Sequence, residues 1–157
     1  MSERSVSHGD FVIERVYDAP IRRVFSAWQK PEKKRRWFAC HDEWVVTHYE
    51  LDFRIGGIER SRTGPAGGTV HAFDARYHDI VDDLRIVYSY EMRLDAALIS
   101  VSLVTVQFEG QGARTAMSFT EQVVVLDGLA SIADREHGTR IGLDALGEYL
   151  TREATEA

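Results

Sequence analysis

Hydrophobic and polar residues alternate with a period of two through most of residues 12–125, the pattern of β-strands with one buried and one wetted face. Residues 138–153 differ, because their apolar positions recur with the 3.6-residue period of an amphipathic helix. A long C-terminal helix that follows so many strands must bury its apolar side against a sheet. The apolar positions of this predicted helix are Ile141, Leu143, Ala145, Leu146, Tyr149 and Leu150.

A helix is predicted directly after the first strand, which covers residues 10–16. Pro20 stops the strand and suits the first turn of a helix, where its missing N–H costs nothing. Ile21, Val24 and Trp28 then follow helical spacing, so the helix should continue to about residue 29 and pack on the sheet.

Pro31 opens a second short helix that ends in the aromatic pair Trp37 and Phe38. We interpret the basic run 33–36 as a solvated helix face, with a docking patch for an acidic partner as the alternative. The aromatic pair fits either a lid over a cavity or core packing.

The remaining strands are predicted to form an antiparallel meander. Residues 43–55 alternate as one long strand with Tyr49 and Phe53 toward the core, which places Trp44 and Val46 on the opposite face. About six or seven strands follow one another as hairpins, with no helix between them. Residues 126–137 fit either a short helix over 129–135 or an ordered loop, separated from the last helix by Gly138. The later strands are expected over 58–62, 69–81, 84–93, 99–109 and 114–125.

Composition narrows the class of protein. The 157 residues suit one domain, with an ordered core over about 8–153, and 44% hydrophobic with 28% charged residues is ordinary for a globular chain. A net charge of -6 argues against a nucleic-acid partner. The single cysteine, Cys40, excludes an intrachain disulfide. Without a signal-peptide pattern or a window of roughly 20 apolar residues, we expect a cytoplasmic protein without a membrane span.

The order of these elements resembles the helix-grip fold of the START and birch-pollen-allergen (SRPBCC) superfamily, and within it the activator-of-heat-shock-protein-90-ATPase homologue family. The resemblance implies an α+β fold in which a curved antiparallel sheet wraps the long C-terminal helix and leaves a cavity between them. In many relatives such a cavity takes an apolar or amphipathic small molecule. A stand-alone domain lacks the N-terminal domain of the eukaryotic co-chaperone, so chaperone activation is not carried over. The resemblance is carried by 16–38, 52–57, 85–92, 104–122 and 143–150.

The leading hypothesis for function is therefore binding of a small apolar or amphipathic molecule between the sheet and the last helix, without a cofactor. Gly142, near the centre of the helical apolar arc, either lets a strand approach or leaves room for a ligand. The predicted cavity residues are Trp37, Phe38, Tyr49, Phe53, Arg60, Tyr88, Tyr90, Val104, Val106, Met117, Phe119, Leu146 and Tyr149.

Two other classes of function stay open. A polyketide cyclase-like, dehydratase or hydrolase enzyme would use Glu121 or His71, with a tyrosine, as an acid or base inside the cavity. An interaction module would act through its surface and have no cavity, and a homodimer would cover Trp44 and Val46. No metal site is expected, because Cys40, His41 and His48 lack metal-binding spacing, and His71 and His78 should face opposite sides of their strand.

Overall fold

The computed structural model describes residues 4–38 and 43–156. Seven strands form one antiparallel sheet in the order β1-β7-β6-β5-β4-β3-β2. This confirms the predicted α+β helix-grip fold and its order of elements. The elements are β1 (Val6–Tyr17), α1 (Ile21–Gln29), α2 (Pro31–Lys34), β2 (Trp44–Leu51), β3 (Ile58–Pro65), β4 (His71–Val81), β5 (Arg85–Leu94), β6 (Ala97–Gln111), β7 (Arg114–Leu126) and α3 (Ile132–Glu156).

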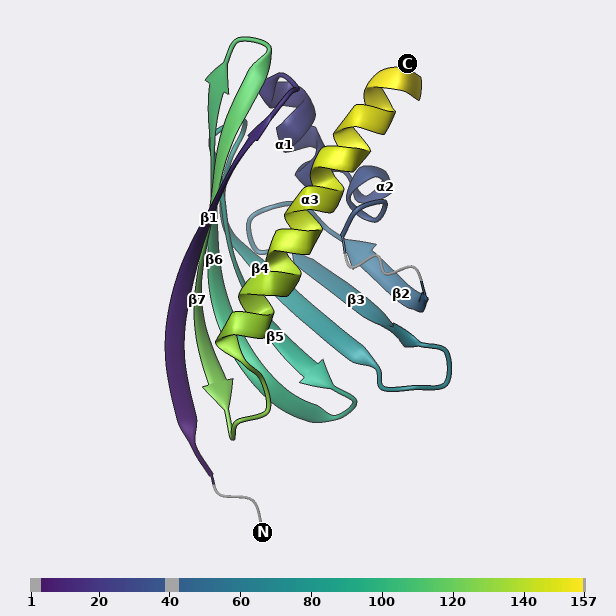
Figure 1. Ribbon diagram of the computed structural model, residues 1–157, viewed down its shortest axis with the longest axis vertical. Helices are drawn as coiled ribbons and strands as arrows, with labels where there is room; N and C mark the ends of the chain where they lie inside the picture. Colours follow the sequence, from purple (N-terminus) through teal and green to yellow (C-terminus); the bar gives the residue numbers. More distant parts are fainter. Residues whose placement is uncertain (1–3, 39–42, 157) are drawn as a thin grey trace.

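The sheet curves, and α3 runs obliquely along its concave side, with α1 and α2 beside the C-terminal half of the helix (Figure 1). The core lies between these layers, because alternate residues of the regular strands point inward. Ile13, Ile86 and Val104 from three strands and Phe25 and Leu146 from two helices are all 0% exposed. One face of the sheet is thus packed and the other wet, as expected for a meander.

The basic run after Pro31 is not a uniformly solvated helix face. Lys34 is completely buried, and its Nζ lies 2.7 Å from a carboxylate oxygen of Glu59 on β3. Its neighbour Lys33 is partly exposed, with 26% of its side chain accessible. The interpretation as a solvated face was therefore wrong for Lys34, because the helix is only four residues long and one of its sides faces β3.

The predicted long strand over 43–55 is shorter than expected and irregular. The register of β2 against β3 shifts between Val46 and His48, which marks a β-bulge. A bulge breaks strict alternation, so Trp44 faces the interior side, where its ring lies 4.4 Å from that of His71, and Val45 is 45% exposed. The predicted outward position of Trp44 was wrong for this reason.

The final helix begins six residues before its predicted start at Gly138, because α3 runs without interruption from Ile132. Its first turn packs closely on β1, where Gly9 has no side chain to obstruct Ile132. Ile141, a predicted apolar position, is 49% exposed. A Cβ atom at Gly142 would meet nothing within 4 Å, so no strand approaches there.

Candidate functional site: a cavity between the sheet and the last helix

A cavity of about 410 Å³ lies between the sheet and the N-terminal turns of α3. Half of its lining residues have aromatic rings, and they come from both helical and strand elements, which is the composition expected of a small-molecule site. Gly138 of α3 borders the cavity, and a Cβ atom added at this glycine would meet nothing within 4 Å. The lining residues are Trp28, Trp37, Phe38, Trp44, Ser61, Thr63, His71, Phe73, Tyr88, Tyr90, Met92, Phe119, Glu121, Asp134, Arg135, Gly138, Thr139 and Leu143.

The structure brings seven of the predicted site residues to this cavity. Strand alternation places Tyr88 and Tyr90 of β5 and Phe119 and Glu121 of β7 on the inner face, and His71 enters from the start of β4. Trp37 and Phe38 complete the set, and both line the cavity while packing on the core. His78 is exposed and bonded to Ser89 on the outer face, so the two histidines do lie on opposite sides.

The other predicted residues lie elsewhere. Arg60 is on the outer face of β3, where it pairs with Glu50 and Asp74. The Tyr149 hydroxyl donates to Glu153 near the far end of α3, at 3.0 Å. Tyr49 binds Glu59. Five more predicted residues pack in the core and do not line the cavity: Phe53, Val104, Val106, Met117 and Leu146.

A polar network closes one side of the cavity around Glu121, which is only 1% exposed. Its Oε2 accepts hydrogen bonds from the hydroxyls of Tyr90 and Ser102, both at 2.7 Å, and from Arg135 at 3.4 Å. Arg135 also donates to Tyr90 at 2.9 Å and to Ser100 at 2.7 Å. Burial and the nearby Glu121 carboxylate raise the pKa of Tyr90, which keeps this phenol protonated as a donor.

A second buried polar cluster stands behind the aromatic wall. Glu59 accepts hydrogen bonds from Lys34, Tyr77 and Tyr49, each at 2.7 Å. The Lys34 ammonium lies 4.5 Å from the ring centre of Phe38, which lines the cavity. Burial lowers the pKa of Lys34, against the opposing effect of Glu59.

Sequence reasoning missed Arg135, Trp44 and the pair Lys34–Glu59. Arg135 falls on the same helical face as Thr139 and Leu143, four and eight residues on, so extending the 3.6-residue period past Gly138 would have indicated it. No sequence signal indicated that Trp44 points toward the interior, because a β-bulge has no characteristic sequence pattern.

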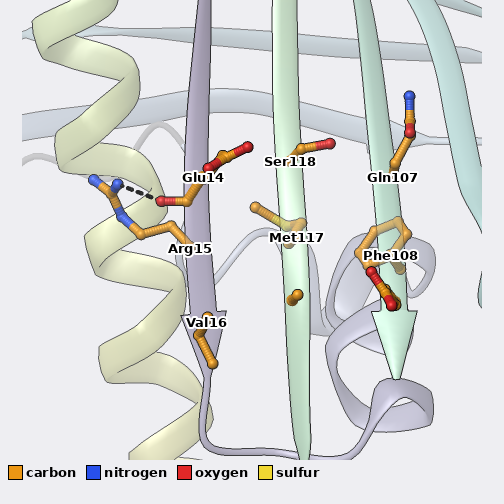
Figure 2. A pocket seen from close by; sticks show the side chains of 9 residues that line it. Glu14, Arg15, Val16, Gln107, Phe108, Met117 and Ser118 are labelled. Carbon is orange, nitrogen blue, oxygen red and sulfur yellow. Dashed lines mark hydrogen bonds between the residues drawn. The ribbon is translucent and has the colours of Figure 1, made fainter. Parts of the chain in front are cut away.

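Other hollows lie on the outward face of the sheet. The one drawn in Figure 2, about 520 Å³, spreads over β1, β7 and β6 and is lined largely by polar side chains such as Glu14, Gln107 and Ser118. Arg15 turns from it toward α3 (Figure 2). Its Nη2 lies 3.2 Å from a carboxylate oxygen of Asp144 on that helix. These surfaces lack the aromatic and apolar lining of the inner cavity, which is therefore the candidate site.

No group of three His, Cys, Asp or Glu side chains that could hold a metal ion occurs within residues 4–38 and 43–156. Cys40 and His41, considered above as metal ligands, lie outside the described residues. Within the described ranges, no helix has both the length and the apolar character needed to cross a bilayer.

An open antiparallel sheet closed by a long C-terminal helix over an aromatic cavity defines a helix-grip protein. The chain belongs to the family described as Activator of Hsp90 ATPase homolog 1-like protein, whose profile matches residues 18–152. This confirms the family resemblance seen in the sequence. Comparison with curated proteins finds no match.

Solved structures agree with this family assignment. A protein from Rhizobium leguminosarum is 54% identical with a TM-score of 0.91, over 96% of this chain and 99% of that one. The Mll3558 protein from Rhizobium loti is 41% identical with a TM-score of 0.85, over 92% of this chain and 99% of that one. An AHSA1-like protein from Aeromonas hydrophila, 21% identical with a TM-score of 0.72 over 93% and 94% of the two chains, shares the fold.

Proposed function

We propose that this protein binds a small, largely aromatic or amphipathic molecule in the cavity between the sheet and α3. The observation that carries the proposal is the cavity itself, about 410 Å³ of open space inside walls of tryptophan, phenylalanine and tyrosine. Large aromatic side chains along such a cavity present apolar surface that a bound ligand would remove from water.

The polar groups of the cavity support binding more than catalysis. The hydrogen bonds that described residues donate to Glu121 converge on Oε2, and Arg135 shares that oxygen. A carboxylate held in this way is suited to keeping the side chains of the cavity wall in place. Its other oxygen, Oε1, is the one available to accept a hydrogen bond from a ligand. Catalytic roles for Glu121 and His71 stay predictions, supported by the presence of both at one cavity. The interaction-module hypothesis expected no cavity, so it is the weaker alternative.

A matched pair of glycines on α3 offers a direct test. A Cβ atom meets nothing within 4 Å at either position. Gly138 borders the cavity, so leucine there places four carbons beside the open volume, whereas Gly142 lies outside the lining. Both changes replace a glycine inside the same helix, so both should stabilise it similarly, by roughly 0.5–1 kcal/mol.

The probe is the neutral fluorescent compound N-phenyl-1-naphthylamine, titrated into each protein. We expect Gly138→Leu to weaken its binding about tenfold or more through steric filling of the cavity, and Gly142→Leu to leave it within about twofold. Equal affinity in both variants would show that the probe binds outside the cavity. Absence of binding to the unaltered protein, by fluorescence and by native mass spectrometry, would contradict the proposal.

A further inference from the structure

Tyr88 is the one tyrosine of the chain whose hydroxyl has no hydrogen-bond partner among the described residues. The chain has six tyrosines. The hydroxyls of the other five donate to a backbone carbonyl or a carboxylate at distances from 2.7 to 3.0 Å. Buried hydroxyls in proteins are nearly always bonded, so this exception calls for a physical reason.

The position of Tyr88 supplies one. Its side chain is 2% exposed yet lines the cavity, and its hydroxyl is not one of the fully enclosed atoms that lack a partner. The neighbouring rings of Tyr77 and Tyr90 lie 5.5 and 6.3 Å away, and their hydroxyls are already committed to carboxylates. The Tyr88 hydroxyl is thus left at the boundary of the open volume.

This hydroxyl stays protonated. Burial, then the neighbouring Tyr90, Glu121 and Glu59, raise the pKa of Tyr88 well above 10. At any physiological pH the group therefore offers an O–H donor inside the cavity.

We propose that Tyr88 is the specificity-determining donor of the cavity, and that its O–H binds a neutral carbonyl oxygen on an aromatic ligand. The inference rests on the proposed binding function and names the class of ligand. The aromatic part of the ligand would stack among the rings of the wall, among them Trp37, Phe38 and Phe119. An unbonded donor in an apolar wall selects for an acceptor, since a ligand without one leaves the donor unsatisfied.

The charges of the cavity favour a neutral acceptor over a carboxylate. The guanidinium of Arg135 already donates to Glu121, Tyr90 and Ser100. Lys34, whose Nζ lies 5.6 Å from the Tyr88 ring centre, is paired with Glu59. An anionic group would therefore meet two carboxylates near Tyr88 and cations that are already engaged. A neutral carbonyl has no such repulsion to overcome.

The test is a cycle of two ligands and two proteins. The ligands are 2-acetylnaphthalene and 2-isopropenylnaphthalene, which have nearly the same shape and differ in a carbonyl oxygen against a methylene group. The proteins are the unaltered chain and Tyr88→Phe. Because the lost hydroxyl has no protein partner, we expect the variant to fold with a melting temperature unchanged within roughly 2 °C. Tyr149→Phe is the control, since its hydroxyl lies outside the cavity and binds Glu153.

Dissociation constants are measured by calorimetry. We expect Tyr88→Phe to lose roughly three- to tenfold in affinity for the ketone, the size of one neutral hydrogen bond, and nothing for the hydrocarbon. The control should keep both affinities. If both ligands bind the unaltered protein and Tyr88→Phe changes neither affinity, or lowers both equally, the assignment of Tyr88 is wrong while the binding function stands. If neither ligand binds the unaltered protein, the binding function and this inference fall together.

Discussion

Lys34 shows how far a single residue can depart from its sequence context. It stands in a run of four basic residues and is nevertheless 0% exposed, with its ammonium against Glu59 at 2.7 Å. A buried ion pair contributes little net stability when it is complete, because both charges lose their hydration. Breaking such a pair is costly, since the remaining charge has no partner.

Replacement of Lys34 by methionine should therefore destabilise the fold by about 3–5 kcal/mol at neutral pH, because Glu59 remains as an uncompensated buried charge. Urea denaturation measures the loss. Lys33→Met is the control; its partner Glu153 has 19% of its side chain exposed, and the change should cost less than about 1 kcal/mol. The double variant Lys34→Met with Glu59→Gln should recover most of the loss, because the amide removes the buried charge and can still form hydrogen bonds with the hydroxyls of Tyr49 and Tyr77. Equal costs at positions 33 and 34 would contradict this account of the pair.

Tertiary contacts decide whether a residue such as Lys34 is buried, and the pattern of polar and apolar residues in the sequence does not record those contacts. Alternation put Tyr88, Tyr90, Phe119 and Glu121 on the inner face, and all four line the cavity, because β5 and β7 are regular around these positions. Lys34 could not be predicted, since a helix of one turn has no period long enough to distinguish its buried side.

At the scale of elements, Glu153 joins three helices. Its carboxylate near the end of α3 contacts Arg23 of α1 at 3.1 Å and Lys33 of α2 at 2.9 Å, and it accepts a hydrogen bond from Tyr149. Burial tends to raise the pKa of Glu153, but the hydrogen bonds from Lys33, Tyr149 and Arg23 outweigh burial and lower it below 4.5.

This lowered pKa gives a pH dependence with a definite sign. Between the folded-state pKa of Glu153 and 4.5 the unfolded chain binds more protons, so stability falls as the pH falls through that window. Glu153→Gln should remove this part of the acid sensitivity, by about 1 kcal/mol or less because the site is partly exposed. Urea denaturation from pH 3 to 7 measures it, with Glu148→Gln, an exposed change on the same helix, as control. An unchanged acid profile in Glu153→Gln would contradict the assignment.

The presence and order of the strands and helices were largely predictable from the sequence, but their boundaries were not. The regular period gave every described strand and the order of hairpins, but Gly138 suggested a helix boundary that does not exist. A glycine inside a helix costs only about 1 kcal/mol, which the packing of neighbouring turns overrides. The bulge in β2 likewise shifted Trp44 into the cavity without a sequence signal.

In the molecule as a whole, α3 is held unevenly. Its C-terminal half buries Leu146, Tyr149 and Leu150 against the core. Its N-terminal turns stand over the cavity, where Arg135 reaches the sheet through Ser100 and Tyr90. Besides the contact of Ile132 with β1, the side of the cavity formed by the helix therefore depends on the hydrogen bonds of Arg135.

Arg135→Ala should consequently loosen one end of the helix. We expect amide hydrogen exchange over residues 132–139 to accelerate about tenfold or more, while residues 146–150 remain protected by their buried contacts. Arg140→Ala is the control, because among the described residues Arg140 pairs only within the helix, with Glu136 at 2.7 Å. Uniform acceleration along α3, or none, would contradict this uneven attachment.

The sheet order also bears on how the chain is made. Strands β2 to β6 each pair with the next strand along the chain, but β1 pairs with β7, so that Val6 lies opposite Leu126. During synthesis on a ribosome, β1 leaves the exit tunnel first and has no strand partner until almost the whole chain has followed. Closing such a long loop is slow relative to forming hairpins. Of the seven described strands, β1 is translated before the others, yet it can join the sheet only once β7 has been made, and a nascent chain carries it unpaired until then.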